Sequence, residues 1–235
     1  MSMKPVIRSV KDSLDGMPIH VRQLAEMFRK HGQKQNRNTS GVNDLDATEV
    51  PAPLRNGWNT NGPTPNAVVD AGHGNRPHPS EYLDQSYIDQ HLDRFSDGAS
   101  RIYITGDIQN WGPGNRDMTF VFPTSELQTI LDETGGDATQ LALRLGMDAD
   151  YYLDAAGNPL PVEIRHFDPS ELTNLRLPDG NEGGANAHWI PGGYLPTGVP
   201  EAVIDIPSDA TGWNNGDGVL DQSRWPGSHE SFTLK

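Results

Sequence analysis

The spacing of apolar residues predicts helices at the beginning of the chain. Over 5–31, apolar side chains recur every three or four residues, as at Val6, Val10 and Leu14. This interval keeps them on one face of an α-helix. Gly32 follows the last of these positions and is typical of the residue that ends a helix. We therefore expect an amphipathic helical segment over 1–32.

The next stretch, 33–80, has no such pattern. It is rich in Pro, Gly and Asn, and its few apolar residues recur with no fixed period. This composition is typical of a linker, and a structureless loop of this length inside a compact domain is uncommon. We therefore predict a linker over 33–80 that joins the helical segment to a globular domain over 81–235.

Helical spacing and strand-like alternation both occur within 81–235. The spacing predicts helices at 82–95, 125–131 and 139–145. The alternation predicts strands at 100–105, 119–123, 160–167 and 201–206. Helices and strands do not alternate regularly, as they would around a parallel sheet. The pattern therefore predicts an α+β fold, with a small mixed or antiparallel sheet and flanking helices.

The charge of the chain changes along its length and bears on its partners. The 235 residues include 18 basic and 32 acidic side chains, which gives a net charge of −14. Residues 1–37 hold eight of the basic and three of the acidic side chains, so the remainder has a net charge of −19. Such an acidic surface repels nucleic acid phosphates. We do not expect a nucleic acid partner.

The sequence lacks the segments that direct a chain to a membrane or to the Sec pathway. It contains no run of 18 apolar residues, and its first residues do not have the basic and apolar parts of a signal peptide. We expect no membrane attachment and no Sec-type signal peptide. The chain also has no Cys, which excludes disulfides and cysteine-ligated metals.

A glycine-rich loop over 176–206 has the highest density of residues suited to chemistry. Its polar and aromatic candidates for substrate binding are Asn181, Glu182, Asn186, His188, Trp189 and Tyr194. Glycines let a ligand approach the backbone, and amides with a tryptophan suit a planar ring. Glu201, where a predicted strand begins, can bind ribose hydroxyls or stabilise a developing cation. The alternative interpretation is an ordered surface loop.

Two arginines of the first predicted strands are candidates for binding an anion. Arg101 lies in the strand at 100–105, and Arg116 lies just before the strand at 119–123. Either guanidinium could hold a diphosphate through two parallel hydrogen bonds. Alternatively, each forms a surface ion pair, for example with Asp117. The sequence does not decide between the two arginines.

Other chemistry is less well supported by the sequence. His166, His188 and Glu163 could act as acid and base in a metal-free ribonuclease, if they lie close together. A calcium loop is not expected over 213–224, because the template's first and last positions are not acidic. We expect no metal site. A third possibility is a secreted binding module without enzymatic activity.

Segments 176–193 and 200–205 resemble the C-terminal effector modules of bacterial polymorphic toxins. Contact-dependent, Rhs-type or type VII systems deliver these modules. The resemblance extends from about residue 87 to about residue 205. It implies secretion or delivery into a target cell, a cognate immunity protein as partner, and a target-cell protein as a candidate acceptor.

A narrower likeness is to NAD-glycohydrolase toxins of the tuberculosis-necrotizing-toxin type and to ADP-ribosyltransferases. The order of motifs along this chain is that of those families: Trp189 with a preceding small residue, then the pair Gly192 and Gly193, then Glu201. Arg101 or Arg116 corresponds to the early arginine of those families. Glu201 stands where the glycohydrolases have glutamine. The likeness implies an enzyme with NAD as substrate, by glycohydrolysis or by ADP-ribosyl transfer. It also implies that Trp189 and Asn186 hold the nicotinamide end.

Overall fold

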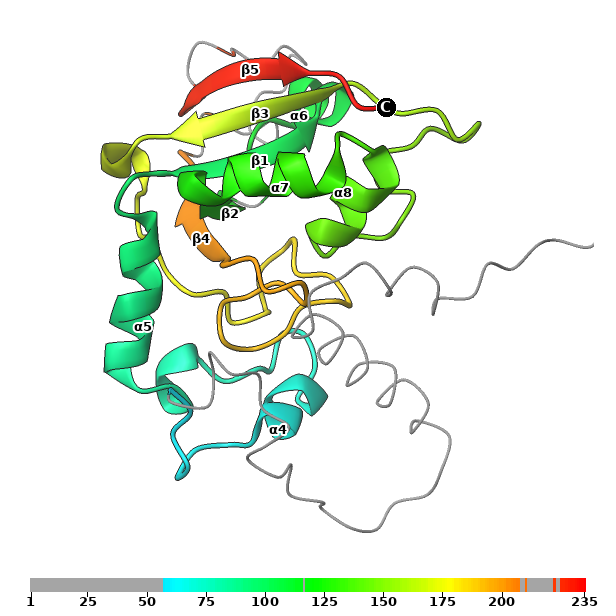
Figure 1. The fold of residues 1–235 in the computed structure, drawn as a ribbon. Coiled ribbons are helices and arrows are strands. Elements are labelled where there is room, and N and C mark those ends of the chain that lie inside the picture. The colour runs from blue at the N-terminus through cyan, green and yellow to red at the C-terminus, as the bar shows by residue number, and fades with distance from the viewer. Residues whose placement is uncertain (1–56, 116, 208–209, 211–221, 223–224) are drawn as a thin grey trace, which may run out of the picture.

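A computed structural model of the chain describes residues 57–115, 117–207, 210, 222 and 225–235. Its centre is a five-stranded antiparallel sheet with strand order β4-β2-β1-β3-β5 (Figure 1). The strands are β1 Ala99–Ile104, β2 Met118–Pro123, β3 Val162–Phe167, β4 Ala202–Asp205 and β5 Ser228–Phe232. The predicted α+β class with an antiparallel sheet is confirmed. The helical segment predicted over 1–32 lies outside the described residues.

Short helices surround this sheet. The α-helices are α4 Pro65–Asp70, α5 Gln85–Leu92, α6 Thr105–Trp111, α7 Leu127–Thr134 and α8 Ala138–Arg144. The 3-10 helices are η1 Pro79–Glu81, η2 Asp93–Phe95, η3 Thr124–Glu126 and η4 Pro169–Glu171. None of the helices in the described part of the chain is long and apolar enough to cross a bilayer.

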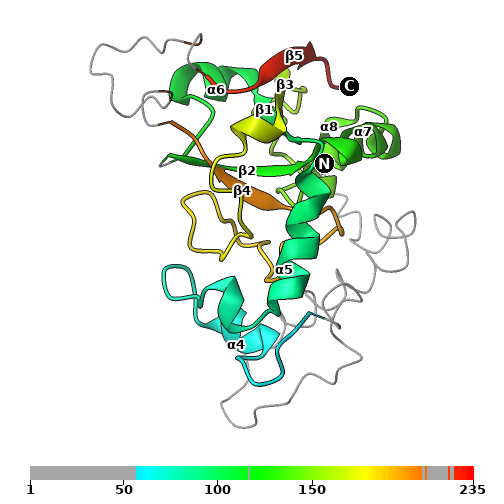
Figure 2. The same cartoon turned by 90° about the vertical axis from the view of Figure 1, so that its left-hand side faces the viewer.

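The sheet divides between β1 and β2. β1 pairs with β3 along its whole length, but with β2 only at Ala99↔Pro123 and Ser100↔Phe122. β2 continues instead as a partner of β4. Figure 2 shows β2 and β4 below β1, β3 and β5. Beyond Ser100, side chains rather than backbone hydrogen bonds therefore occupy the space between β1 and β2.

Two apolar clusters cover the two faces of the sheet. On one face, Ile130 of α7 and Leu141 of α8 pack against Ile164 of β3. On the other, Ile108 of α6 packs with residues that include Tyr103 and Ile204. Figure 1 shows α7 and α8 lying across the first face.

A third cluster joins 57–83 to the rest of the molecule. Val68 of α4 is fully buried, and Trp58 stacks on Tyr82 with ring centroids 4.9 Å apart. Leu177 and Trp189 of the glycine-rich loop complete the cluster. The described end of the predicted linker thus packs against the globular domain, because its few apolar side chains are large. The division of the chain into three parts stays a prediction.

Candidate functional site

The split between β1 and β2 opens into a cavity of about 80 Å³. Side chains from β1, β2, the segment after α8 and the glycine-rich loop line it. A second cavity of about 330 Å³ shares Arg101 and Asn186 with it, and Asn115, Asp148 and Tyr151 also line this second cavity. The predicted site residues that line the cavity are Arg101, Asn186, His188, Trp189, Tyr194 and Glu201. Residues far apart in the sequence therefore meet at one place.

Glu201 lines the cavity and lies immediately before β4. Its N–H donates to the Gly193 carbonyl at 2.7 Å, and its own carbonyl lies 2.9 Å from His91 Nε2. The side chain is partly buried, and no described residue donates a hydrogen bond to its carboxylate. Burial raises the pKa of Glu201 to about 8, Arg101 acts to lower it, and Glu182 acts to raise it. The carboxyl is therefore mostly protonated at pH 7.

Arg101 occupies the gap where the ladder between β1 and β2 stops. One terminal nitrogen donates to Thr119 Oγ1 at 2.6 Å and to the Phe120 carbonyl at 3.3 Å. The guanidinium also lies 4.8 Å from the centre of the Tyr103 ring. No described carboxylate forms an ion pair with Arg101. The Arg101 side chain thus lines the cavity, and its positive charge is available to an anionic ligand.

Trp189 and Tyr194 supply aromatic surface to the cavity. Trp189 is only 6% exposed and belongs to the third apolar cluster, with the Arg76 guanidinium 4.4 Å above its ring. Tyr194 is partly buried and meets the His91 ring edge-on, with centroids 4.8 Å apart. Trp189 is therefore a wall of the cavity and part of the core at once.

Asn186 and His188 lie at the mouth of the cavity. The Asn186 side-chain amide donates to the Gly146 carbonyl at 3.2 Å. His188 Nε2 lies 2.9 Å from Asp148 Oδ1, and both side chains are exposed. These contacts attach the glycine-rich loop to the segment after α8, across the opening.

Asn181 and Glu182 do not line the cavity. Asn181 Oδ1 accepts from the N–H of Gly74 at 2.7 Å and of Arg76 at 3.1 Å. The two carboxylate oxygens of Glu182 accept from the N–H groups of Asp179 and Gly180, each at 2.8 Å. Asn181 therefore joins the loop to the backbone of 74–76, and Glu182 holds the backbone of the loop itself. Arg116 lies outside the described residues.

The acid–base pair of the ribonuclease interpretation is not brought together. His188 lines the cavity, whereas His166 does not. His166 contacts Ser100 Oγ at 3.1 Å and Glu230 at 3.5 Å. Glu163 forms a buried ion pair with Arg165, with Oε1 and Nε 2.8 Å apart. Each of these residues therefore has a separate partner.

Helix α5 holds the inner part of the glycine-rich loop through residues that the sequence did not single out. The Tyr87 hydroxyl donates to the Gly192 carbonyl at 2.8 Å, and His91 contacts the carbonyl of Glu201. A signal was present, because Leu83, Tyr87, His91 and Phe95 are spaced by four residues. This spacing places a histidine within an otherwise apolar face.

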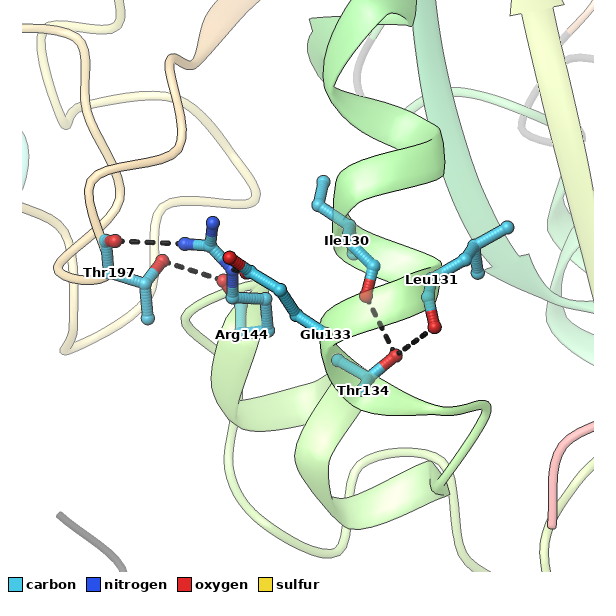
Figure 3. A network of polar contacts seen from close by, with 6 residues as sticks. All are labelled: Ile130, Leu131, Glu133, Thr134, Arg144 and Thr197. Carbon is cyan, nitrogen blue, oxygen red and sulfur yellow. Dashed lines mark hydrogen bonds and ion pairs between the residues drawn. The ribbon is translucent and has the colours of Figure 1, made fainter. Parts of the chain in front are cut away.

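Helix α8 holds the outer turn of the same loop (Figure 3). Arg144 donates from Nη1 to the Thr197 carbonyl at 2.8 Å, and Thr197 Oγ1 donates to the Arg144 carbonyl at 2.6 Å. Arg144 Nε also forms an ion pair with Glu133 at 2.8 Å. The segment from Gly192 to Glu201 is thus held at its two ends by α5 and in its middle by α8.

Comparisons with protein-family models, with curated proteins and with solved structures found no match for this chain. Among the residues that the structure describes, no three His, Cys, Asp or Glu side chains lie together so that they could hold a metal ion. Any assignment of function therefore depends on the geometry of the cavity and on the chemistry of its side chains.

Proposed function

We propose that this cavity is the active site of an NAD-consuming enzyme that breaks the bond between nicotinamide and ribose. The observation that carries the proposal is the meeting of Arg101 and Glu201 in one cavity with aromatic walls, although one hundred residues separate them in the sequence. A guanidinium that forms no ion pair with a described carboxylate, a carboxyl group and aromatic rings match the diphosphate, the ribose and the base of a dinucleotide.

Each group has a distinct role in the proposed reaction. Arg101 binds the diphosphate, and Trp189 with Asn186 holds the nicotinamide end. The C–N bond breaks, nicotinamide leaves with the bonding electron pair, and positive charge develops on the ribose. Glu201 binds the ribose hydroxyls and stabilises this cation. The oxygen of a water molecule then bonds to the anomeric carbon, and the proton of that water passes to Glu201 or to solvent.

The protonation state of Glu201 depends on the charges that NAD brings into the cavity. Burial keeps the carboxyl mostly protonated at pH 7 when only Arg101 faces it. The pyridinium ring of NAD carries a positive charge, which favours the ionised form, whereas the diphosphate bound to Arg101 carries negative charge, which opposes it. The stabilising role of Glu201 requires the ionised form, so the pyridinium ring has to lie nearer to the carboxyl group than the diphosphate does.

The proposal also includes the biological setting. The resemblance to toxin modules supports delivery into a target cell and a cognate immunity protein that protects the producing cell. The acidic surface favours an inhibitor with a basic face. ADP-ribosyl transfer to a target-cell protein shares the bond-breaking step with hydrolysis and differs only in the acceptor.

The test is the release of nicotinamide from NAD by the purified chain, measured by chromatography. We expect release by the parent, and a loss of at least about a hundredfold in kcat/KM for Glu201→Gln and for Arg101→Gln. The first removes the group that becomes the carboxylate, and the second removes the positive charge that binds the diphosphate. Glu230→Gln, which changes an exposed carboxylate on β5, is the matched control and should retain activity. A label on the adenylate half distinguishes free ADP-ribose from a modified protein.

Two results would contradict the proposal. The parent could release no nicotinamide, or Glu201→Gln could be as active as the parent. Degradation of RNA by the same preparation would favour the ribonuclease interpretation, which the separation of His166 from His188 supports poorly. Binding of a partner without any turnover would favour the binding module.

A further inference from the structure

The peptide groups of Glu201 are held from two sides. The N–H donates to Gly193 of the same loop, and the carbonyl accepts from His91 of α5. Gly193 has a φ of +76°, and a Cβ added there would lie 2.9 Å from His91 Nε2. The absence of a side chain at Gly193 is therefore what lets His91 reach this part of the loop.

The His91 side chain is a neutral hydrogen-bond donor. Its side chain is 2% exposed, between Tyr87, Phe95 and Tyr194. A carbonyl oxygen only accepts, so the contact with Glu201 places the proton on Nε2. Nδ1 has no described partner. Burial, together with the nearby Arg94, lowers the pKa of His91 to about 4, although the hydrogen bond to the Glu201 carbonyl acts to raise it, so the ring stays neutral at pH 7.

We propose that His91 is a positioning residue for Glu201, whose hydrogen bond to the Glu201 carbonyl fixes the backbone from which the carboxyl group points into the cavity. His91 itself does not line the cavity. No described residue donates to the Glu201 carboxylate, so the direction of this side chain depends on its backbone. The expected effect of His91 on the catalytic rate rests on the proposed function. The expected effect of His91 on the position of the Glu201 carboxyl group does not.

A pair of substitutions of similar size separates the hydrogen bond from the packing. His91→Gln keeps a nitrogen donor near the position of Nε2, and His91→Met fills the space without one. Tyr87→Phe is the control, because it removes the hydrogen bond from the same helix to Gly192 but leaves the contact with Glu201. The rate of nicotinamide release from NAD and the titration of the Glu201 carboxyl carbon by NMR are measured in each. Glu201→Gln identifies the resonance.

For His91→Met we expect kcat to fall by at least about tenfold, while KM changes by less than about threefold, because misplacement of a reacting group affects the transition state most. His91→Gln and Tyr87→Phe should stay within about threefold of the parent kcat. The Glu201 carboxyl should titrate near pH 8 in the parent. In His91→Met its pKa should move toward the ordinary glutamate value by at least about one unit, since a displaced carboxyl reaches more water.

The two measurements separate the two proposals. If the parent releases no nicotinamide, the proposed function fails, and the NMR titration alone decides the role of His91. An unchanged Glu201 titration in His91→Met would overturn the inference, whatever the activity. A loss of kcat in Tyr87→Phe as large as that in His91→Met would also overturn it, since general loosening of the loop would then explain both.

Discussion

Glu201 and His91 are titratable groups whose pKa values move in opposite directions for the same reason. Burial disfavours the charged form of each, which raises the pKa of the carboxyl to about 8 and lowers that of the imidazole to about 4. The stability that His91 contributes is complete above its ordinary pKa of 6.5 and is lost as the pH falls toward 4. The stability that Glu201 contributes is complete below pH 4.5 and is lost as the pH rises through 8.

The Glu201 effect predicts a pH-dependent gain in stability for Glu201→Gln. Between pH 4.5 and 8 the unfolded chain releases the Glu201 proton before the folded chain does, so the free energy of unfolding of the parent falls. Glutamine does not titrate. We expect Glu201→Gln to exceed the parent by about 2–4 kcal/mol near pH 9 and to match it near pH 4. Urea unfolding at several pH values measures this difference.

The control for this prediction is Glu230→Gln on β5, because Glu230 is 62% exposed. Its stability should follow that of the parent across the pH range. If Glu201→Gln and the parent lost stability with the same slope, Glu201 would have an ordinary pKa in the folded chain.

At the scale of elements, α5 and α8 determine the shape of the loop that ends at Glu201. α5 contacts Gly192 and Glu201, and α8 contacts Thr197 through the reciprocal hydrogen bonds of Figure 3. Arg144, the last residue of α8, would otherwise have a backbone carbonyl without a partner, as is usual at a helix end. The loop therefore supplies a hydrogen-bond donor to the carbonyl at the helix end, and Arg144 in turn holds the loop in place.

This arrangement predicts that Thr197→Val loosens the loop. Thr197 is 7% exposed, and its hydroxyl donates to the Arg144 carbonyl. Valine keeps the shape and removes the donor, so we expect a loss of about 1–2 kcal/mol in the free energy of unfolding and faster hydrogen exchange over 192–201. Glu133→Gln removes the partly exposed ion pair with Arg144 and should cost at most about 0.5 kcal/mol. Equal exchange in both variants would argue against the role of the hydroxyl.

At the scale of the whole molecule, Trp189 connects the cavity to the segment 57–83. It lines the cavity and also packs with Val68, Tyr82 and Leu83. Asn181 contributes to the same junction through its hydrogen bonds to the backbone of Arg76. The binding surface and the packing of this segment therefore depend on one side chain.

We accordingly predict that Trp189→Ala affects more than ligand binding. Loss of a buried tryptophan should lower the free energy of unfolding by roughly 3–5 kcal/mol and speed hydrogen exchange throughout 57–83. Trp111→Ala is the matched control, because Trp111 is 62% exposed and its loss should cost less than about 0.5 kcal/mol. Normal protection of 57–83 in Trp189→Ala would contradict this account of the junction.

Local pattern was sufficient for most helices and strands. The predicted strand at 100–105 corresponds to β1 Ala99–Ile104, and the predicted helix at 139–145 to α8 Ala138–Arg144. α4, α6 and β5 were not predicted, because α4 buries only Val68, α6 buries only Ile108 and β5 is largely exposed. An element with so few apolar positions leaves no periodic signal in the sequence.

The sequence by itself determined which residue types were available for chemistry, and most of those it indicated line the cavity. Only the tertiary structure distinguished Glu201, whose carboxylate accepts no hydrogen bond from a described residue, from Glu182, whose carboxylate binds backbone N–H groups. The physical reason is that a carboxylate accepts hydrogen bonds equally well from a loop and from a ligand. Contacts between distant parts of the chain determine where the ladder between β1 and β2 stops. They therefore also determine where Arg101 meets Glu201. Local spacing does not encode such contacts.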